Sequence, residues 1–344
     1  MFLPWISGKR YQKTAIVGIC KNAGKTTVLN AIMQSHNLAW GLITTGRDGE
    51  AEDVIYKTPK PRVQIPRGSL FCVDSACLDA LGTSISIREK TIWQSGGKRL
   101  WIAKAESDLE SEIGGPQNTV AQIAMANRLL HWGAEKVLID GSLDRKSIAL
   151  SDSVQAVVLA IGASFGSVET IVQELTRLLS LASLPRFSRA TSKVCHTLLN
   201  SETIMLKRGA KWQSTGLSSL LGNEKQLEAI LGAVKGGENH LSPHEYSHIY
   251  LPGAYTISVH NRIGKLLSRL QIVLRHAECL KLQKTELDAY LRDNQPQVLI
   301  PFQIKSIALN SYAVGANPID ADFYRQELRK SFPNIVLTDL KEIS

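Results

Sequence analysis

The segment Gly18-Ile-Cys-Lys-Asn-Ala-Gly24-Lys25-Thr26-Thr27 combines residue types that bind phosphate. It follows the apolar run Thr14-Ala-Ile-Val-Gly18 and precedes a helical pattern, which is the context that a phosphate-binding loop requires. Small residues let backbone N–H groups surround a phosphate chain, and a helix N-terminus adds partial positive charge. We therefore expect a nucleotide-binding site here. Its phosphate-binding residues are Gly18, Lys21, Asn22, Ala23, Gly24, Lys25, Thr26 and Thr27.

Lys25 and Thr26 have distinct expected roles. In a phosphate-binding loop the lysine contacts the outer phosphates and assists catalysis, and the following hydroxyl holds Mg²⁺. Five residues separate Gly18 from Gly24, whereas the common G-x-x-x-x-G-K-T pattern has four. A chance Gly-Lys-Thr at a helix start is the alternative. The strand before it and a later strand that ends in an acid argue against chance.

That later strand is Lys136-Val-Leu-Ile-Asp140. An acid at a strand end beside a phosphate-binding loop can bind Mg²⁺ directly or through water. We therefore expect Asp140 to be a metal-binding and catalytic residue, and the alternative is an acid that caps the following turn. Asp144 and Arg145 follow closely. Arg145 is a candidate nucleotide contact, unless this loop is simply solvated.

A second polar loop, Arg47-Asp-Gly-Glu50, follows the expected strand Leu38 to Thr45. In P-loop proteins this position often holds a switch-like loop. Asp48 or Glu50 could bind Mg²⁺ or orient the attacking water, and Arg47 could contact a phosphate. We take Asp48 as a catalytic and metal-binding candidate. A plain Asp-Gly turn is the alternative.

The elements around these residues alternate between apolar strands and amphipathic helices. This alternation predicts an α/β protein with a mostly parallel sheet. Further strands are expected at Arg99 to Ala105 and Val154 to Ile161. The expected helices are those with apolar faces at Val28 to Met33, Val120 to Leu130 and Val168 to Leu179.

The pattern predicts two domains, since the chain has 344 residues and domains average about 150. Residues 1–181 form the expected nucleotide-binding domain, with a strand-rich excursion at about 59–98. Residues 182–344 form a second, smaller α/β domain. Its expected strands are 247–251, 270–274 and 298–308, and its expected helices are 284–292 and 320–330.

Composition narrows the function classes. The formal net charge is +9, but the Lys and Arg residues form no long run, which disfavours a nucleic-acid partner. No apolar run approaches the roughly 18 residues of a membrane helix, so no membrane partner is expected. Five scattered cysteines and no signal-peptide pattern in Met1 to Gly8 predict a cytoplasmic protein.

A histidine-rich stretch gives weaker evidence for a site than the phosphate-binding segment does. His240, His244 and His248 are four residues apart, but Pro243 interrupts any helix that would align them. We expect a solvated loop, and metal binding there stays open.

The loop spacing resembles that of dethiobiotin synthetase and the cobyrinic acid a,c-diamide synthases, in the broader group of MinD/ParA-type ATPases. The additional lysine of MinD/ParA-type loops is replaced here by Cys20, with Lys21 one residue later. A narrower resemblance rests on Thr45-Gly-Arg-Asp-Gly-Glu50, Lys60-Pro-Arg-Val, Pro66-Arg-Gly-Ser-Leu70, the segment from Val137 to Lys146, and Ala316-Asn-Pro318. Together these are similar to the P-loop subunit of the lysine 5,6-aminomutase reactivating factor.

This resemblance implies an ATPase with a MutS-like ATPase subunit, a cobalamin-dependent aminomutase, or both as partners. ATP binding and hydrolysis would then remodel a partner, in this case to reactivate the aminomutase. Two alternatives remain: a synthetase or amidoligase that phosphorylates a small carboxylate substrate, and a nucleotide-sensing subunit without turnover. The residues themselves do not distinguish ATP from GTP, because no base-specificity motif is evident.

Overall fold

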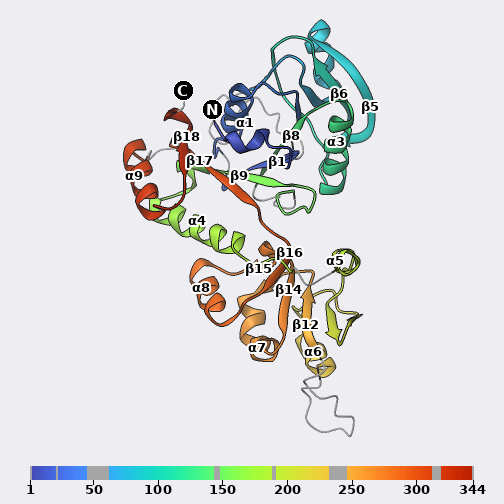
Figure 1. Cartoon of the computed structure of the whole chain (residues 1–344), viewed down its shortest axis with the longest axis vertical. Coiled ribbons are helices and arrows are strands. Elements are labelled where there is room, and N and C mark those ends of the chain that lie inside the picture. Colours follow the sequence, from blue (N-terminus) through green and yellow to red (C-terminus); the bar gives the residue numbers. More distant parts are fainter. Residues whose placement is uncertain are drawn as a thin grey trace. The chain divides into compact units, whose positions relative to one another are not determined.

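The computed structural model describes residues 2–20, 22–44, 62–142, 148–187, 191–231, 246–311 and 319–342. The chain divides into two compact units (Figure 1). Unit 1 comprises Met1–Val172 and Gln303–Ser344, and unit 2 comprises Gln173–Phe302. The first break lies after residue 172, not after the expected residue 181, and residues 303–344 belong to unit 1 instead of the second domain.

Unit 1 contains a nine-stranded sheet in the order β18-β17-β9-β1-β8-β2-β4-β6-β5. Neighbouring strands from β18 to β4 are parallel, and β6 and β5 add an antiparallel hairpin. The α/β class and the mostly parallel sheet are therefore confirmed. The strand bounds, in chain order, are β1 Lys13–Gly18, β2 Trp40–Thr44, β4 Leu70–Asp74, β5 Ile85–Ser95, β6 Lys98–Ala105, β8 Lys136–Ser142, β9 Ala156–Gly162, β17 Ile304–Asn310 and β18 Leu337–Asp339.

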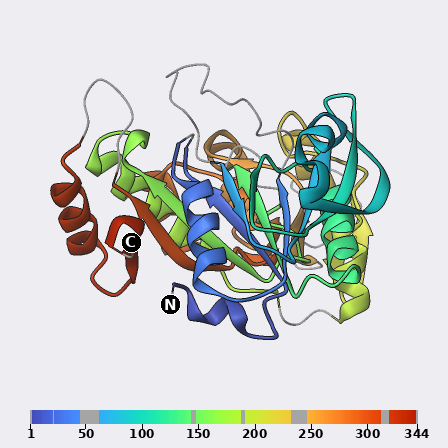
Figure 2. The same ribbon diagram turned by 90° about the horizontal axis from the view of Figure 1, so that it is seen from above.

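Helices cover both faces of this sheet. On one face, α1 (Lys25–Ser35) buries Val28, Leu29 and Ile32 in a core that includes Leu138 of β8. On the other, α3 (Thr119–His131) approaches β2 closely, since a Cβ at Gly41 would lie 3.1 Å from Cβ of Leu129. The same Cβ would lie 2.9 Å from Val137, and neighbouring strand residues point to opposite faces. Figure 2 shows α1 (blue) packed against the strands.

Two of the three strands in the segment before residue 98, β4 and β5, extend the main sheet. β4 pairs in parallel with β2, and β6 pairs with both β4 and β5. A separate two-stranded pair joins β3 (Val63–Ile65) to β7 (Leu109–Ser111). The remaining elements of unit 1 are η1 Pro4–Ser7, α2 Ser75–Leu81, η2 Gly82–Ser84, η4 Ala163–Phe165, α9 Ala321–Ser331 and η6 Leu340–Glu342.

Unit 2 is built around a smaller mixed sheet in the order β11-β10-β12-β14-β16. β12, β14 and β16 are parallel, and β10 pairs antiparallel with β11 and β12. Its core includes Phe187, Leu198, Tyr250 and Val273. The strands are β10 Met205–Arg208, β11 Lys211–Ser214, β12 Tyr246–Leu251, β13 Tyr255–Thr256, β14 Gln271–His276, β15 Leu280–Lys281 and β16 Gln297–Ile300. The helices are α5 Ser192–Leu199, α6 Glu224–Ile230, α7 Ile257–Leu267, η5 Ala277–Cys279 and α8 Lys284–Asp293, and the unit boundary lies within α4 (Val168–Ala182).

One predicted strand was wrong. The apolar stretch 298–308 forms two strands, β16 and β17, which belong to different sheets and different units. Pro301 lies between them, and proline cannot donate a ladder hydrogen bond. β17 then pairs in parallel with β9, which is why residues 303–344 belong to unit 1.

No helix among the described residues is long and apolar enough to span a membrane.

Candidate functional site

The segment predicted to bind phosphate follows β1, a central strand of the large sheet. Gly18 ends β1 and is paired with Ser142 of β8 on one side and Ala160 of β9 on the other. Ile19 then donates its backbone N–H to Ala160 O at 3.0 Å. The loop therefore leaves the carboxyl end of the sheet, where ligands bind in open parallel α/β sheets.

The loop backbone is tightly curled. Asn22 has φ 59° and Gly24 has φ 89°, so two residues adopt left-handed conformations within one short loop. A Cβ at Gly18 would lie 2.8 Å from Cβ of Ala23, which explains the need for glycine there. Such a curl is a shape in which successive N–H groups can face a single anion.

Gly24 is the N-cap of α1, and its carbonyl accepts the N–H of Val28 at 2.9 Å. Lys25, Thr26 and Thr27 therefore form the first turn of the helix. This turn contains no acidic residue, so nothing in it neutralises the positive end of the helix dipole. Lys25 and Thr26 lie where an anion at the helix N-terminus would meet an ammonium and a hydroxyl.

Cys20 lies within the same loop. Burial raises the pKa of its thiol to about 11, although the Lys25 ammonium acts in the opposite direction. The thiol is therefore neutral at physiological pH. This state suits a small structural residue rather than a nucleophile.

Asp140 is nearly fully buried near the carboxyl end of β8. It is paired with Ile16 of β1 and with Thr44 of β2. Leu138, two residues earlier, packs in the core on the α1 side, and strand residues two apart share a face. Asp140 therefore lies on the face of the sheet that α1 covers, in the strand next to β1.

A glycine segment, Gly114-Gly115, contacts the end of β2. Thr44 donates its N–H to Gly114 O at 3.1 Å, and Gly114 donates to Cys72 O of β4 at 2.6 Å. A Cβ at Gly115 would lie 1.8 Å from Thr44 O, so no larger residue fits. This segment bridges β2 and β4 beyond their last paired residues.

Several predicted site residues lie outside the described ranges. They are Lys21, Arg47, Asp48, Glu50, Asp144 and Arg145, together with His240 and His244. Of the histidine stretch, His248 lies in β12, where its ring contacts those of Phe187 and Trp212 at centroid distances of 5.7 and 6.0 Å. Within the part of the chain that the structure describes, no group of three or more His, Cys, Asp or Glu side chains could hold a metal ion.

Two residues against the loop were not predicted from the sequence. A Cβ at Gly162, the last residue of β9, would lie 2.7 Å from Cα of Ala23. Asn310, the last residue of β17, donates from Nδ2 to Asn22 O at 3.3 Å. The only sequence signal for either is a small or polar residue that ends an apolar run.

Comparison with known proteins assigns this chain to no family. No protein-family model matches the chain, and a search of curated proteins finds no significant relative.

Proposed function

We propose that this protein is a Mg²⁺-dependent P-loop nucleoside triphosphatase that acts on ATP. One observation supports the proposal above all: a curled loop with two left-handed residues joins a central parallel strand to the N-terminus of an eleven-residue helix. Backbone N–H groups and the helix dipole at such a junction favour a phosphate anion. The buried acid of the adjacent strand supports it further.

Each residue has a role that follows from its chemistry. Lys25 would neutralise the outer phosphates, and Gly18 and Gly24 allow the close packing on Ala23 and Asn310 that shapes the loop. Thr26 and Asp140 supply a hydroxyl and a carboxylate, which are oxygen ligands that Mg²⁺ prefers. When bound, the metal neutralises charge that develops on the phosphate oxygens.

The biological use that we propose for this activity is nucleotide-driven remodelling of a protein partner. A ligand can shift a conformational equilibrium only by its differential affinity for the two states, so ATP and ADP must favour different states. The resemblance to aminomutase-reactivating subunits motivates the choice of an adenosylcobalamin-dependent aminomutase, with a MutS-like ATPase subunit, as the first partners to assay.

The first experiment measures phosphate release from Mg-ATP and Mg-GTP by the wild type and Lys25→Ala, with nucleotide binding measured in parallel. Loss of a charged phosphate contact should abolish turnover and weaken binding at least about tenfold, with little change in melting temperature. The matched control is Lys305→Ala, which removes the same charge from an exposed position at the amino end of β17 in the same unit.

The outcomes separate the three functions considered. Slow turnover that a protein partner stimulates supports the proposal. Turnover that requires a small carboxylate indicates a synthetase, and binding without turnover indicates a nucleotide sensor. No binding of either nucleotide by the wild type contradicts the proposed function altogether.

A further inference from the structure

The ends of two strands, β9 and β17, contact the phosphate loop. Gly162 of β9 and Asn310 of β17 are directly paired with each other in the sheet. Gly162 lies against Ala23, as described above. Asn310 contacts the loop at two points: its Nδ2 bonds to Asn22 O, and its side chain packs so closely on Gly24 that a Cβ there would lie 2.9 Å from Cβ of Asn310.

These two contacts fall on the two residues with positive φ. Gly24 adopts this conformation at little cost, but Asn22 is one of only two non-glycine residues with positive φ in the described part of the chain. Such a conformation is disfavoured for a residue with a Cβ, so surrounding contacts must maintain it. The hydrogen bond from Asn310 to Asn22 is one such contact.

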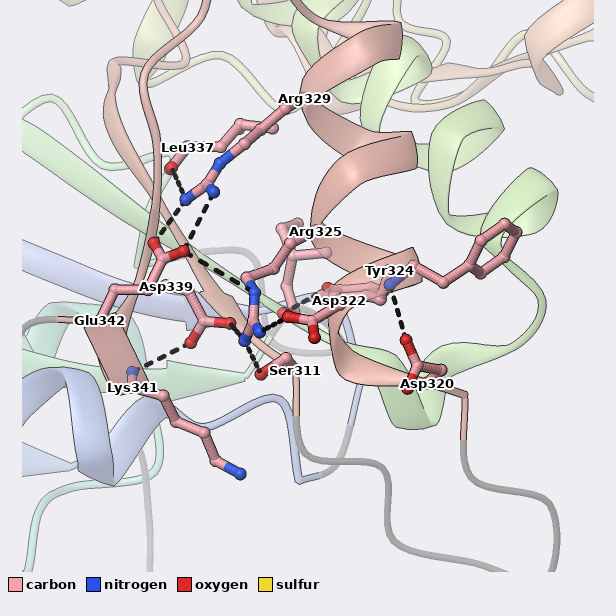
Figure 3. Close-up of polar contacts among 12 residues, drawn as sticks. Ser311, Asp320, Asp322, Tyr324, Arg325, Arg329, Leu337, Asp339, Lys341 and Glu342 are labelled. Atoms are coloured by element: carbon pink, nitrogen blue, oxygen red, sulfur yellow. Dashed lines mark hydrogen bonds and ion pairs between the residues drawn. The ribbon is translucent and has the colours of Figure 1, made fainter.

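The residue after Asn310 connects this support to the C-terminal segment (Figure 3). Ser311 is buried, and its Oγ accepts a hydrogen bond from Nη1 of Arg325 at 3.2 Å. The same Nη1 donates to Oδ2 of the fully buried Asp339 in β18 at 3.1 Å. Arg325 also pairs with Asp322 and Glu342. The hydrogen bond to Asp339, above all, raises the pKa of Arg325.

A second contact joins the same helix to the other supporting strand. Tyr324 of α9 is fully buried, and its hydroxyl donates to Ile161 O at 2.9 Å, one residue before Gly162. Both strands that support the loop are therefore bonded to α9 within one residue of their loop contacts. Arg325 and Tyr324 are adjacent in that helix, so any shift of its first turns would act on both strand ends.

We propose that Asn310 is a positioning residue that keeps the phosphate loop in its nucleotide-binding shape, and that α9 holds Asn310 in place through Arg325 and Ser311. This inference rests on the proposed function for its consequence, nucleotide affinity, but not for the loop geometry itself. The C-terminal segment is accordingly part of the nucleotide site, although it lies almost 290 residues from the loop in sequence.

The predicted effect is a loss of preorganisation. If the competent loop conformation is only fractionally populated, the apparent dissociation constant rises by the inverse of that fraction. Removal of the Asn310 donor is expected to weaken Mg-ATP binding by about tenfold, and removal of the Ser311 hydroxyl by about threefold. Neither residue is expected to be required for the chemical step once nucleotide is saturating.

The test uses full-length Asn310→Leu, which keeps the side-chain size but removes the donor, and Ser311→Ala, which removes only the bond to Arg325. Arg329→Ala is the matched control: Arg329 lies on the same helix and pairs with Glu342, but it has no bond to Ser311. Hydrogen exchange of residues 18–28 is measured without nucleotide, and Mg-ATP affinity and saturated turnover are measured separately.

Faster exchange of the loop in both variants, with unchanged exchange in β8 and in the Arg329→Ala control, supports the inference. Rescue by Asn310→Gln, which restores a donor, would strengthen it. Loop exchange identical to the wild type in both variants overturns it, whatever the nucleotide measurements show. Faster loop exchange in a protein that binds no nucleotide contradicts the proposed function but leaves the positioning role intact.

Discussion

At the residue scale, burial determines the reactivity of Cys20. A thiol of pKa about 11 has a thiolate fraction at pH 8 that is about 100-fold smaller than one of pKa 9. We predict that iodoacetamide modifies Cys20 about 100-fold more slowly than an unhindered cysteine at this pH. We also expect its rate to keep rising with pH up to about 11.

The measurement is peptide mass spectrometry of alkylation against time between pH 7 and 11. Cys195, which lies in α5 with a half-buried side chain, serves as an internal reference in the same molecule. Rapid modification of Cys20 at pH 7, saturating with pH below 9, would contradict the neutral thiol. It would indicate instead that Lys25 outweighs burial and that the loop contains a reactive cysteine.

Gly162 and Asn310, which contact the loop, could not be predicted from residue spacing as the loop itself was. Gly18, Gly24 and Lys25 are close in sequence, so their spacing carries the signal. Gly162 and Asn310 contact the loop only because β9 and β17 pair with each other and β9 pairs with β1. That information lies in the strand order of the sheet, and a single sequence specifies strand order only through long-range packing.

At the element scale, the apolar periodicity of the sequence predicted those helices and strands that are determined by nearby residues. β1, α1, α3, β8 and α9 lie within about two residues of their expected positions, because apolar periodicity is strong in each. α7 (Ile257–Leu267) was missed, although its N-cap Thr256 accepts the N–H of Val259. The prediction of a single strand at 298–308 was wrong for a different reason. Two strands of different sheets are separated there by only three residues. Periodicity alone does not separate two such strands.

His276, the last residue of β14, gives the stability of unit 2 a pH dependence. Burial lowers the pKa of His276 to about 4; Glu278 acts against this shift, whereas Lys281 and Arg275 add to it. The unfolded chain takes up the proton near pH 6.5, but the folded chain only near pH 4. Stability is therefore complete above pH 6.5 and falls as the pH drops towards 4. The expected loss at pH 5 is roughly 2 kcal/mol.

Urea unfolding followed by circular dichroism at pH 7 and pH 5 measures this loss. His276→Gln cannot take up the proton, so its unfolding free energy should change less between the two pH values. His196→Gln is the matched control, since His196 is exposed on α5 of the same unit. An unaltered pH dependence in His276→Gln would show that other groups cause the acid sensitivity.

At the scale of the whole molecule, unit 1 is discontinuous in sequence. Residues 303–344 contribute β17 next to β9, and α9 and β18 beyond it. Ile307, Leu309, Tyr324 and Leu328 are all buried in unit 1. At about 1.5–3 kcal/mol for each buried side chain, these four alone contribute roughly 6–12 kcal/mol. This is comparable to the whole folding stability of a typical domain.

Truncation after Phe302 is therefore expected to unfold unit 1, because it exposes the paired edge of β9 and also removes the contact of Asn310 with Asn22. Truncation after Phe332 removes β18 but keeps β17 and α9, and it should give a folded, less stable protein. Size-exclusion chromatography and circular dichroism distinguish the two. A soluble, folded chain ending at Phe302 that still binds Mg-ATP as the full chain does would show that unit 1 needs only residues 1–172. In that case the strand order would contribute neither to its stability nor to its site.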